Sequence, residues 1–367
     1  MNLVYVITRA DAVGGATIHV RDLAREMIAR GHQVTVLVGG EGPVTRQLAA
    51  AGVPYQSLRH LRRSIHPVRD LLAVREMVSA LRQLRPELVS AHTAKAGLVA
   101  RAACARLRVP AIYTPHGWTI GSRISPLAGP LFGLVERLAA RWSAAIVCVC
   151  DAERRLALEN GIGPPNRLRL IYNGMPDIAM DMRADPTGEP VRILCVARME
   201  APKDHQTLFE ALAALRWHSW NLELVGDGPL ELKLRVLAEA LNIDDRIEWA
   251  GYLPDPAPAL EKAQLFVLAS CSEAFPRSIL EAMRAGLPVV ATDVGGVREA
   301  VAEDESGILV PANDPEAMAN ALDLLLTSGA LRQRMGEMGR HIFEERFRFE
   351  RMADETAALY SERCRGG

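Results

Sequence analysis

Two carboxylates lie eight residues apart in the stretch Ser272-Glu273-Ala274-Phe275-Pro276-Arg277-Ser278-Ile279-Leu280-Glu281. The apolar run 265–268 before it predicts a buried strand, and Pro276 cannot occupy a strand interior. Apolar residues then recur at helical spacing, so Glu273 is expected on a loop and Glu281 in the first turns of a helix. The unpaired N–H groups at the start of such a helix favour a phosphate. The stretch therefore predicts a sugar-nucleotide site in which one glutamate binds ribose hydroxyls and the other hexose hydroxyls.

The sequence that follows this stretch is also specific. It reads Gly286-Leu287-Pro288-Val289-Val290-Ala291-Thr292-Asp293-Val294-Gly295-Gly296. With the two glutamates, it resembles the donor-site signature of retaining GT-B glycosyltransferases of family 4 (GT4), and the resemblance covers nearly the whole chain. The segments 91–97 and 114–118 resemble the bacterial exopolysaccharide and lipid-carrier members of that family. Ala274 departs from the pattern, because the family usually has glycine there, and this would restrict the loop backbone.

The resemblance implies an α/β chain with two doubly wound Rossmann-like domains facing a central cleft, and a C-terminal helix that returns to the first domain. Residues 1–173 would form the acceptor-binding domain, 174–190 a linker, 191–346 the nucleotide-sugar donor domain and about 347–367 the returning helix. The apolar pattern independently predicts strands that alternate with helices, which is typical of a parallel sheet covered on both faces. Strands are expected at 3–7, 34–38, 88–90, 111–114 and 145–149, then at 191–197, 222–225, 247–250, 265–268, 289–291 and 307–310, with helices such as 18–29, 94–107 and 131–141.

The composition favours a globular protein with two domains. A chain of 367 residues is longer than one hydrophobic core usually supports. No apolar run has the length needed to span a bilayer, and the first residues lack the pattern of a signal peptide. Six cysteines without a Cys-x-x-Cys pair are typical of reduced thiols. We therefore expect a cytoplasmic protein.

A diphosphate donor needs fixed positive charge, because the nucleotide leaves as an anion. Arg198 and Lys203 follow the first strand of the second series, and they resemble the cations of the family's Gly-Arg-Leu loop that ends in Lys-Gly. Ala197 and Asp204 stand where glycines are commoner, which leaves the geometry of this loop open. The loop around the donor sugar is expected to comprise Ala274, Phe275, Pro276 and Ser278.

Gly14 and Gly15 lie between the first strand and the first helix. Without side chains, their backbone could approach a phosphate or a sugar. They are not part of a dinucleotide fingerprint, because Gly-x-Gly-x-x-Gly is missing and the second strand ends in Gly39-Gly40 rather than an acidic residue. This argues against an NAD-dependent oxidoreductase.

His116 stands in a tight Pro-His-Gly turn after an apolar strand. By resemblance it lies beside the transferred hexose, where it would stabilise an oxocarbenium-like transition state. Similar reactions need no protein nucleophile, because the leaving phosphate takes the proton of the acceptor on the same face of the sugar, which gives retention.

Further loops would border the nucleobase by resemblance, although ordinary turns explain them almost equally well. They contain Gly226, Asp227, Gly228 and Tyr252. The sequence has no Asp-x-Asp motif, and its nine histidines show no ligand spacing, so neither a metal nor another cofactor is expected.

Charge is distributed unevenly along the chain. Residues 1–173 hold 23 Lys and Arg against 11 Asp and Glu, net +12, and the remainder holds 20 against 33, net −13. Seven arginines crowd the segment 58–86, which also has helical apolar spacing. Two interpretations stay open, a solvated surface and contact with an anionic membrane. Because no aromatic residues alternate with these arginines, nucleic-acid binding is disfavoured.

These observations predict a metal-independent retaining hexosyltransferase. It would move a hexose from a nucleoside-diphosphate sugar, with UDP favoured, to a glycan or polyprenyl-diphosphate-linked acceptor in bacterial polysaccharide biosynthesis. It would be cytoplasmic, with peripheral contact at the inner face of the plasma membrane left open. Two alternatives remain: a nucleotide-sugar 2-epimerase of the GT-B type, and a nucleotide-sugar-binding module without turnover.

Overall fold

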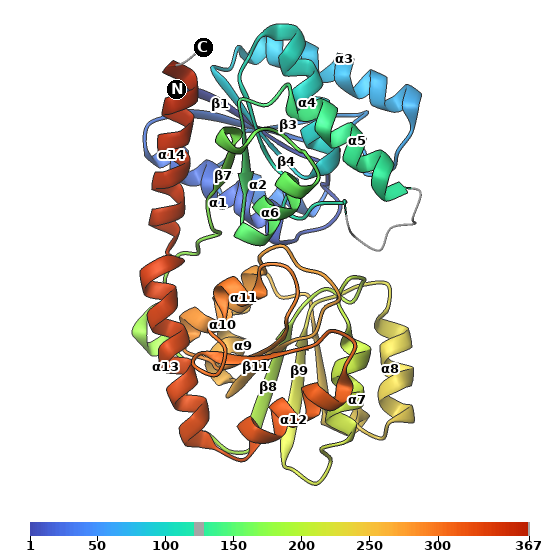
Figure 1. The fold of residues 1–367 in the computed structure, drawn as a ribbon, viewed down its shortest axis with the longest axis vertical. Coiled ribbons are helices and arrows are strands. Elements are labelled where there is room, and N and C mark those ends of the chain that lie inside the picture. The colour runs from blue at the N-terminus through green and yellow to red at the C-terminus, as the bar shows by residue number, and fades with distance from the viewer. Residues whose placement is uncertain (121–127, 366–367) are drawn as a thin grey trace. The chain divides into compact units, whose positions relative to one another are not determined.

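The computed structural model describes residues 1–120 and 128–365, and the chain divides into two compact units (Figure 1). The first unit comprises Met1–Tyr172 and Met352–Gly367, and the second comprises Asn173–Arg351. Each contains one parallel sheet with helices on both faces, which buries both sides of the strands. The two doubly wound sheets expected from the sequence are confirmed.

The first unit has a seven-stranded sheet in the order β3-β2-β1-β4-β5-β6-β7, and its strands pair in parallel. The strand order reverses between β1 and β4. Ligands of doubly wound sheets bind at the carboxyl ends of the strands near such a reversal. The strands are β1 (Asn2–Ile7), β2 (Gln33–Val38), β3 (Tyr55–Ser57), β4 (Leu88–His92), β5 (Ala111–Thr114), β6 (Ala145–Cys148) and β7 (Leu168–Leu170).

Helices of the first unit mostly coincide with the helical patterns in the sequence. Among them, α4 has the predicted bounds, and α3 occupies the arginine-rich segment. They are α1 (Gly15–Ala29), α2 (Pro43–Ala50), α3 (Pro67–Leu84), α4 (Ala94–Leu107), α5 (Ala128–Ala140), α6 (Asp151–Glu159) and most of α14 (Phe349–Arg365), with a 3-10 turn at Pro165–Arg167. The buried residues of α14 recur at helical spacing, at Met352, Ala353, Thr356, Leu359 and Tyr360.

The second unit repeats this architecture with six strands in the order β10-β9-β8-β11-β12-β13, which reverses between β8 and β11. The strands are β8 (Val191–Val196), β9 (Trp220–Val225), β10 (Ile247–Gly251), β11 (Leu265–Leu268), β12 (Val289–Thr292) and β13 (Gly307–Val310). The helices are α7 (His205–Ala213), α8 (Glu231–Ala240), α9 (Ala257–Lys262), α10 (Arg277–Ala285), α11 (Val297–Ala300), α12 (Pro315–Leu326) and α13 (Gly329–Arg346), with 3-10 turns at Met180–Met182 and Asp244–Arg246.

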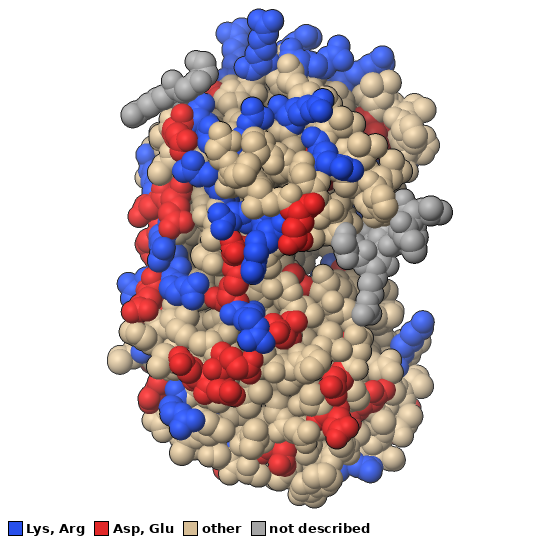
Figure 2. Space-filling model, in the orientation of Figure 1, with Lys and Arg blue, Asp and Glu red and all other residues tan. Residues whose placement is uncertain are grey.

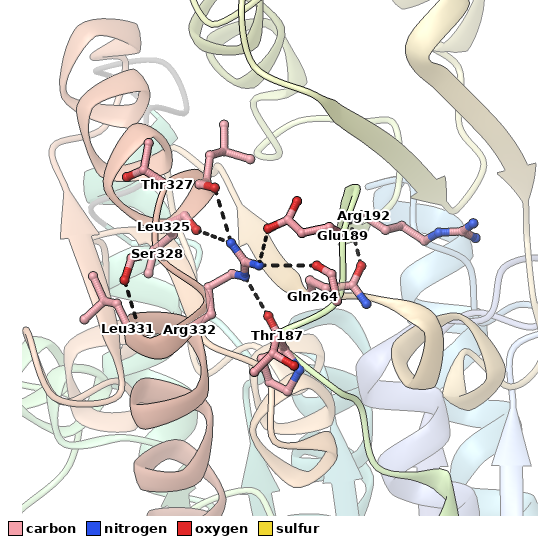
Figure 3. Close-up of polar contacts among 12 residues, drawn as sticks. Thr187, Glu189, Arg192, Gln264, Leu325, Thr327, Ser328, Leu331 and Arg332 are labelled. Carbon is pink, nitrogen blue, oxygen red and sulfur yellow. Dashed lines mark hydrogen bonds and ion pairs between the residues drawn. The ribbon is translucent and has the colours of Figure 1, made fainter.

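The segment 174–190, expected as a linker, is fixed to the second unit by two arginines of α13. Arg332 is fully buried and donates to the carbonyl oxygen of Pro186 at 2.6 Å and to the Glu189 carboxylate at 2.8 Å (Figure 3). Arg340 forms a bidentate ion pair with Asp177, at 2.5 and 2.7 Å. Since a buried guanidinium needs its donors satisfied, these bonds make the segment an integral part of the unit.

Candidate functional site

The loops after β8 and β11 meet at the strand-order reversal of the second unit. They are joined by backbone hydrogen bonds from Asp204 N to Ala269 O, at 3.0 Å, and from Cys271 N to Pro202 O, at 2.8 Å. Asp204 also begins α7, because its carboxylate accepts from Thr207 N at 3.1 Å. This cap explains why an aspartate suits the position where the related loops usually have glycine.

Lys203 and Glu273 form an ion pair across these two loops. Ser270 Oγ donates to the same oxygen of Glu273, Oε1, at 2.6 Å. The side chains of the pair are 18% and 11% exposed, so both are mostly shielded from solvent. The arrangement holds a cation and a carboxylate side by side at the carboxyl edge of the sheet, where a diphosphate and a sugar hydroxyl could each take one of them.

Arg198 follows β8 and pairs with Glu200 at 3.2 Å. Its loop packs against the glycine loop after β9, because Met199 N donates to Asp227 O at 2.8 Å. Gly226 and Gly228 have positive φ, and a Cβ would lie 2.0 Å and 2.4 Å from the carbonyl oxygens of Ala197 and Met199. These two glycines therefore allow the loops to approach each other.

Two further residues expected near the nucleobase lie on the same edge. The side chain of Asp227 is exposed. Tyr252 directly follows β10 and is 42% exposed, and the strand end before it is tied to the glycine loop by Gly226 N donating to Gly251 O at 2.8 Å. Both side chains are accessible to a ligand.

The first turn of α10 follows the Glu273 loop, as predicted. Pro276 is its N-cap residue, Ser278 lies in the first turn and Glu281 lies one turn further, 9% exposed. Ala274 does not adopt a positive φ, so the loop does not need glycine at this position. Phe275 is buried and packs on Phe347, with ring centroids 5.4 Å apart, so its side chain belongs to the core.

Gly295 lets the Glu273 loop pass close to the loop after β12. It has φ +58°, and a Cβ would lie 1.7 Å from the Glu273 carbonyl oxygen. The next residue, Gly296, donates its N–H to Ala274 O at 2.9 Å. Gly295 and Gly296 therefore support the backbone of the loop that carries Glu273.

In the first unit, α1 begins at Gly15, three residues before the predicted start at 18. Gly14 is the N-cap residue, and its N–H already donates to Thr17 Oγ1 at 2.9 Å. The amides at the start of α1 that remain for a ligand are thus those of Gly15 and Ala16.

His116 lies beside two other histidines at the carboxyl edge of the first sheet. It has φ +54°, and its Nε2 is 2.9 Å from Nδ1 of His92, the last residue of β4. The ring of His19, on α1, is 4.8 Å from that of His116. One nitrogen from each ring lies within 4.8 Å of the others, a spacing that could hold a metal ion. Burial, and then the electrostatic influence of the neighbouring His116 imidazole, lower the pKa of His92 well below its usual value, so the His92 imidazole is neutral.

His19 and His92 were not among the predicted site residues, although His92 lies in the segment 91–97. A signal existed in the strand order: β4 pairs with β5 so that His92 lies opposite Thr114, two residues before His116. Only the sheet topology brings these positions together.

Glu153 holds the turn that carries His116. Its two carboxylate oxygens accept from Gly117 N at 2.7 Å and from Val149 N at 3.1 Å, and its carbonyl oxygen accepts from Trp118 Nε1 at 3.0 Å. It is 5% exposed and lies in the first turn of α6, where the helix dipole favours a negative charge. No sequence motif pointed to Glu153 either.

Comparison with known proteins identifies the family of the chain. The model for "Glycosyl transferases group 1" matches residues 181–342, and the model for "Glycosyl transferase 4-like domain" matches residues 14–174. The chain belongs to the family-4 glycosyltransferases, and it has the GT-B fold.

Individual relatives are similar over much of the chain. An exopolysaccharide phosphotransferase of Streptomyces coelicolor is 33% identical over 80% of the chain, but this covers only 30% of that relative's length. The N-acetyl-alpha-D-glucosaminyl L-malate synthase of Bacillus anthracis is 25% identical over 98% of the chain and 97% of its own. The crystal structure of Anabaena HepE in complex with UDP and glucose has a TM-score of 0.86 at 21% identity, with 98% and 99% of the two chains covered.

Within the described residues, every helix is too short or too polar to span a bilayer.

Proposed function

We propose that this glycosyltransferase moves a hexose from UDP-hexose to an acceptor hydroxyl with retention at C1 and without a metal. The Lys203–Glu273 pair at the start of α10 carries the proposal, because it offers a cation, a carboxylate and a helix N-terminus at one edge of the sheet. Lys203 and Arg198 bind the diphosphate, with the amides of Gly15 and Ala16 as further donors. Glu273 binds the hexose and Glu281 the ribose.

In the proposed reaction, the bond from C1 to the diphosphate oxygen breaks as the acceptor oxygen approaches the same face. The departing diphosphate takes the acceptor's proton, so UDP and the glycoside are the products. Arg198 and Lys203 stabilise the negative charge that develops on the diphosphate. His116 donates a hydrogen bond to the hexose, while the backbone around Ala274, Pro276 and Ser278 lines the sugar and the loops with Asp227 and Tyr252 line the base.

The preference for UDP is supported by the HepE structures, which contain UDP, UDP with glucose, or UDP-glucose. A thermal-shift comparison of UDP, GDP and ADP tests it, since a ligand that binds only the folded state raises the melting temperature. The largest shift is expected with UDP, and equal shifts would contradict the choice. Incubation with UDP-hexose alone must then leave the sugar unchanged, because an epimer would indicate an isomerase.

We propose a polyprenyl-diphosphate-linked acceptor at the cytoplasmic face of an anionic membrane. Figure 2 shows Lys and Arg crowding the end of the first unit that carries α3. The arginines of this segment are exposed. Both α3 and α5 pack against α4, and α5 exposes an apolar stripe. Exposed apolar residues flanked by arginines suit the surface of an anionic bilayer. The stripe comprises Leu131, Leu134 and Leu138 and continues to Trp142, with exposed fractions of 59%, 47%, 46% and 45%.

Sedimentation with anionic liposomes at low salt tests the membrane contact. The double substitution of Leu134 and Leu138 by Ser is expected to reduce the bound fraction. A matched control replaces Leu232 and Val236 of α8, which are 75% and 59% exposed on the acidic unit. Equal retention of both variants would contradict the proposed surface.

A further inference from the structure

A chain of hydrogen bonds runs from α14 to His116 through the interior of the first unit. The Tyr360 hydroxyl is 2.9 Å from Ser90 Oγ, and Ser90 Oγ is 3.0 Å from His92 Nε2. His92 Nδ1 is in turn 2.9 Å from His116 Nε2. Tyr360, Ser90 and His92 are each 1% exposed, so water does not compete for these bonds.

The order of donors along this chain follows from the buried phenol. A neutral imidazole has one N–H donor and one acceptor, and each hydroxyl has one proton. If Tyr360 donates to Ser90, then Ser90 donates to His92 Nε2 and His92 donates from Nδ1 to His116 Nε2, so every proton is used. In the reverse order the Tyr360 proton would have to find another acceptor beside the fully buried Tyr5. The neighbouring Tyr5 hydroxyl interacts with that of Tyr360, and no further partner among the described residues could take a proton from Tyr5. In the first order Tyr5 can instead donate to Tyr360, so only the reverse order leaves the Tyr5 proton without an acceptor. A buried unsatisfied donor is costly, which favours the first order.

We propose that Tyr360, Ser90 and His92 are positioning residues that hold His116 as its Nδ1–H tautomer. Because Nε2 of His116 then accepts from His92, its single proton is on Nδ1, the nitrogen that donates to the hexose. This role rests on the proposed function of His116. The role also connects α14 to the site, because Tyr360 of this helix supplies the hydroxyl that sets the direction of the hydrogen bonds.

Packing keeps the chain in place. The ring of Tyr5 stacks on His92 with centroids 5.7 Å apart and planes 11° apart, and the Tyr360 ring meets Tyr5 edge-on at 6.3 Å. His19 lies edge-on against His116 at 4.8 Å. Glu153 fixes the backbone of the same turn through Gly117 N. The imidazole of His116 is therefore constrained from its backbone and from its ring.

Two substitutions of His92 separate its two hydrogen bonds. The amide of Asn can occupy the place of Nδ1, and the longer Gln can occupy the place of Nε2. H92N therefore keeps a donor for His116, whereas H92Q keeps a partner for Ser90 and loses the bond to His116. We expect H92Q to lower kcat by about 10- to 100-fold, the usual effect of removing a residue that orients a functional imidazole, with KM for the sugar nucleotide within about threefold. H92N should stay within about fivefold of the parent in kcat, and equal losses in both variants would overturn the proposal.

The phenol has a matched control in the same sheet. Tyr113 is another fully buried tyrosine, on β5, and its hydroxyl approaches Glu136 at 3.4 Å rather than the histidines. Y360F is expected to lower kcat while Y113F leaves it unchanged. If the two variants lose activity equally, the phenol of α14 has no special role.

Nitrogen-15 NMR of histidine-labelled protein reads the tautomer without any turnover, with His116 assigned by its loss in H116N. At pH 7.5 we expect a proton on Nδ1 of His116 and none on Nε2. A proton on Nε2 of His116 in an active enzyme would contradict the proposed order of hydrogen bonds but not the proposed function. The Nδ1–H tautomer in a protein that neither binds nor turns over a sugar nucleotide would instead overturn the proposed function.

Discussion

The two units place their candidate functional residues at equivalent edges of similar sheets but hold them in opposite ways. In the second unit, Lys203 and Arg198 are charged, partly exposed and paired with carboxylates. In the first unit, His116 is held through His92 by hydrogen bonds among buried neutral groups. Paired surface charges exchange partners easily, whereas buried neutral networks are costly to rearrange. From this comparison we expect the second site to accept an ionic ligand and the first to keep one geometry.

Lys203 is expected to show the largest effect on activity. Lys203→Ala removes the charge proposed to stabilise the leaving diphosphate and leaves Glu273 without its cation. Loss of such a group typically lowers kcat by about 100- to 1000-fold, or about 2.7 to 4 kcal/mol. Steady-state kinetics measure this, and Lys233→Ala on the exposed face of α8 is the control. A kcat within threefold of the parent would remove Lys203 from the reaction.

Substitution of Gly295 tests whether the loop that carries Glu273 depends on the close approach of the loop after β12. Gly295→Ala places a Cβ 1.7 Å from the Glu273 carbonyl oxygen at a positive φ. The backbone strain and the clash together are expected to cost about 2 to 5 kcal/mol of unfolding free energy and to weaken UDP binding. Denaturant unfolding and calorimetry measure the two effects.

The matched control for this variant is Gly286→Ala. Gly286 ends α10 with φ +80°, and a Cβ there would meet nothing within 4 Å. This substitution should cost only the strain, about 1 kcal/mol, and leave UDP binding intact. Similar losses in both variants would mean that contact with Glu273 contributes nothing.

The regular part of the fold and the second site were predictable because their signals are local. Apolar runs specify the strands, and Pro276 together with the spacing of Ile279 and Leu280 specifies the start of α10. Parallel strands then bring the Lys203 and Glu273 loops to one edge without further information. The roles of these side chains in catalysis remain predictions.

The parts that escaped the sequence depend on contacts between distant residues. Tyr360 and Ser90 are separated by 270 positions, and no periodic pattern links them. Glu153 looks like an ordinary first-turn carboxylate until Gly117 is placed beside it. The segment 174–190 shows no apolar periodicity. It is held by arginines that bind its carbonyl oxygens and carboxylates, and such bonds do not constrain the residue type along the segment. Side-chain partnerships across a sheet therefore require the tertiary structure.

Glu281 distinguishes binding from turnover within the second unit. Glu281→Ala is expected to weaken UDP binding by about 1.5 to 3 kcal/mol, the range for losing a hydrogen bond to a charged group. Glu281→Gln keeps the shape and one acceptor, so a smaller loss is expected. Isothermal titration calorimetry compares the three proteins, and unchanged affinity in the Ala variant would remove Glu281 from the ribose.

His205 tests the smallest effect and shows that the second unit also contains a fixed, neutral group. It is the first residue of α7, and burial followed by the charge of Lys203 lowers its pKa to about 4. Below pH 6.5 the His205 imidazole binds a proton in the unfolded chain but not in the folded one. The stability that comes from burying a neutral imidazole is therefore fully present above pH 6.5 and is lost as the pH falls toward 4. Between these values, His205 should reduce the unfolding free energy by about 1.4 kcal/mol per pH unit. Urea unfolding of the parent and of His205→Gln from pH 7.5 to 5 measures this slope. The variant should lose less stability over that range, and parallel curves would show that His205 is charged in the folded protein.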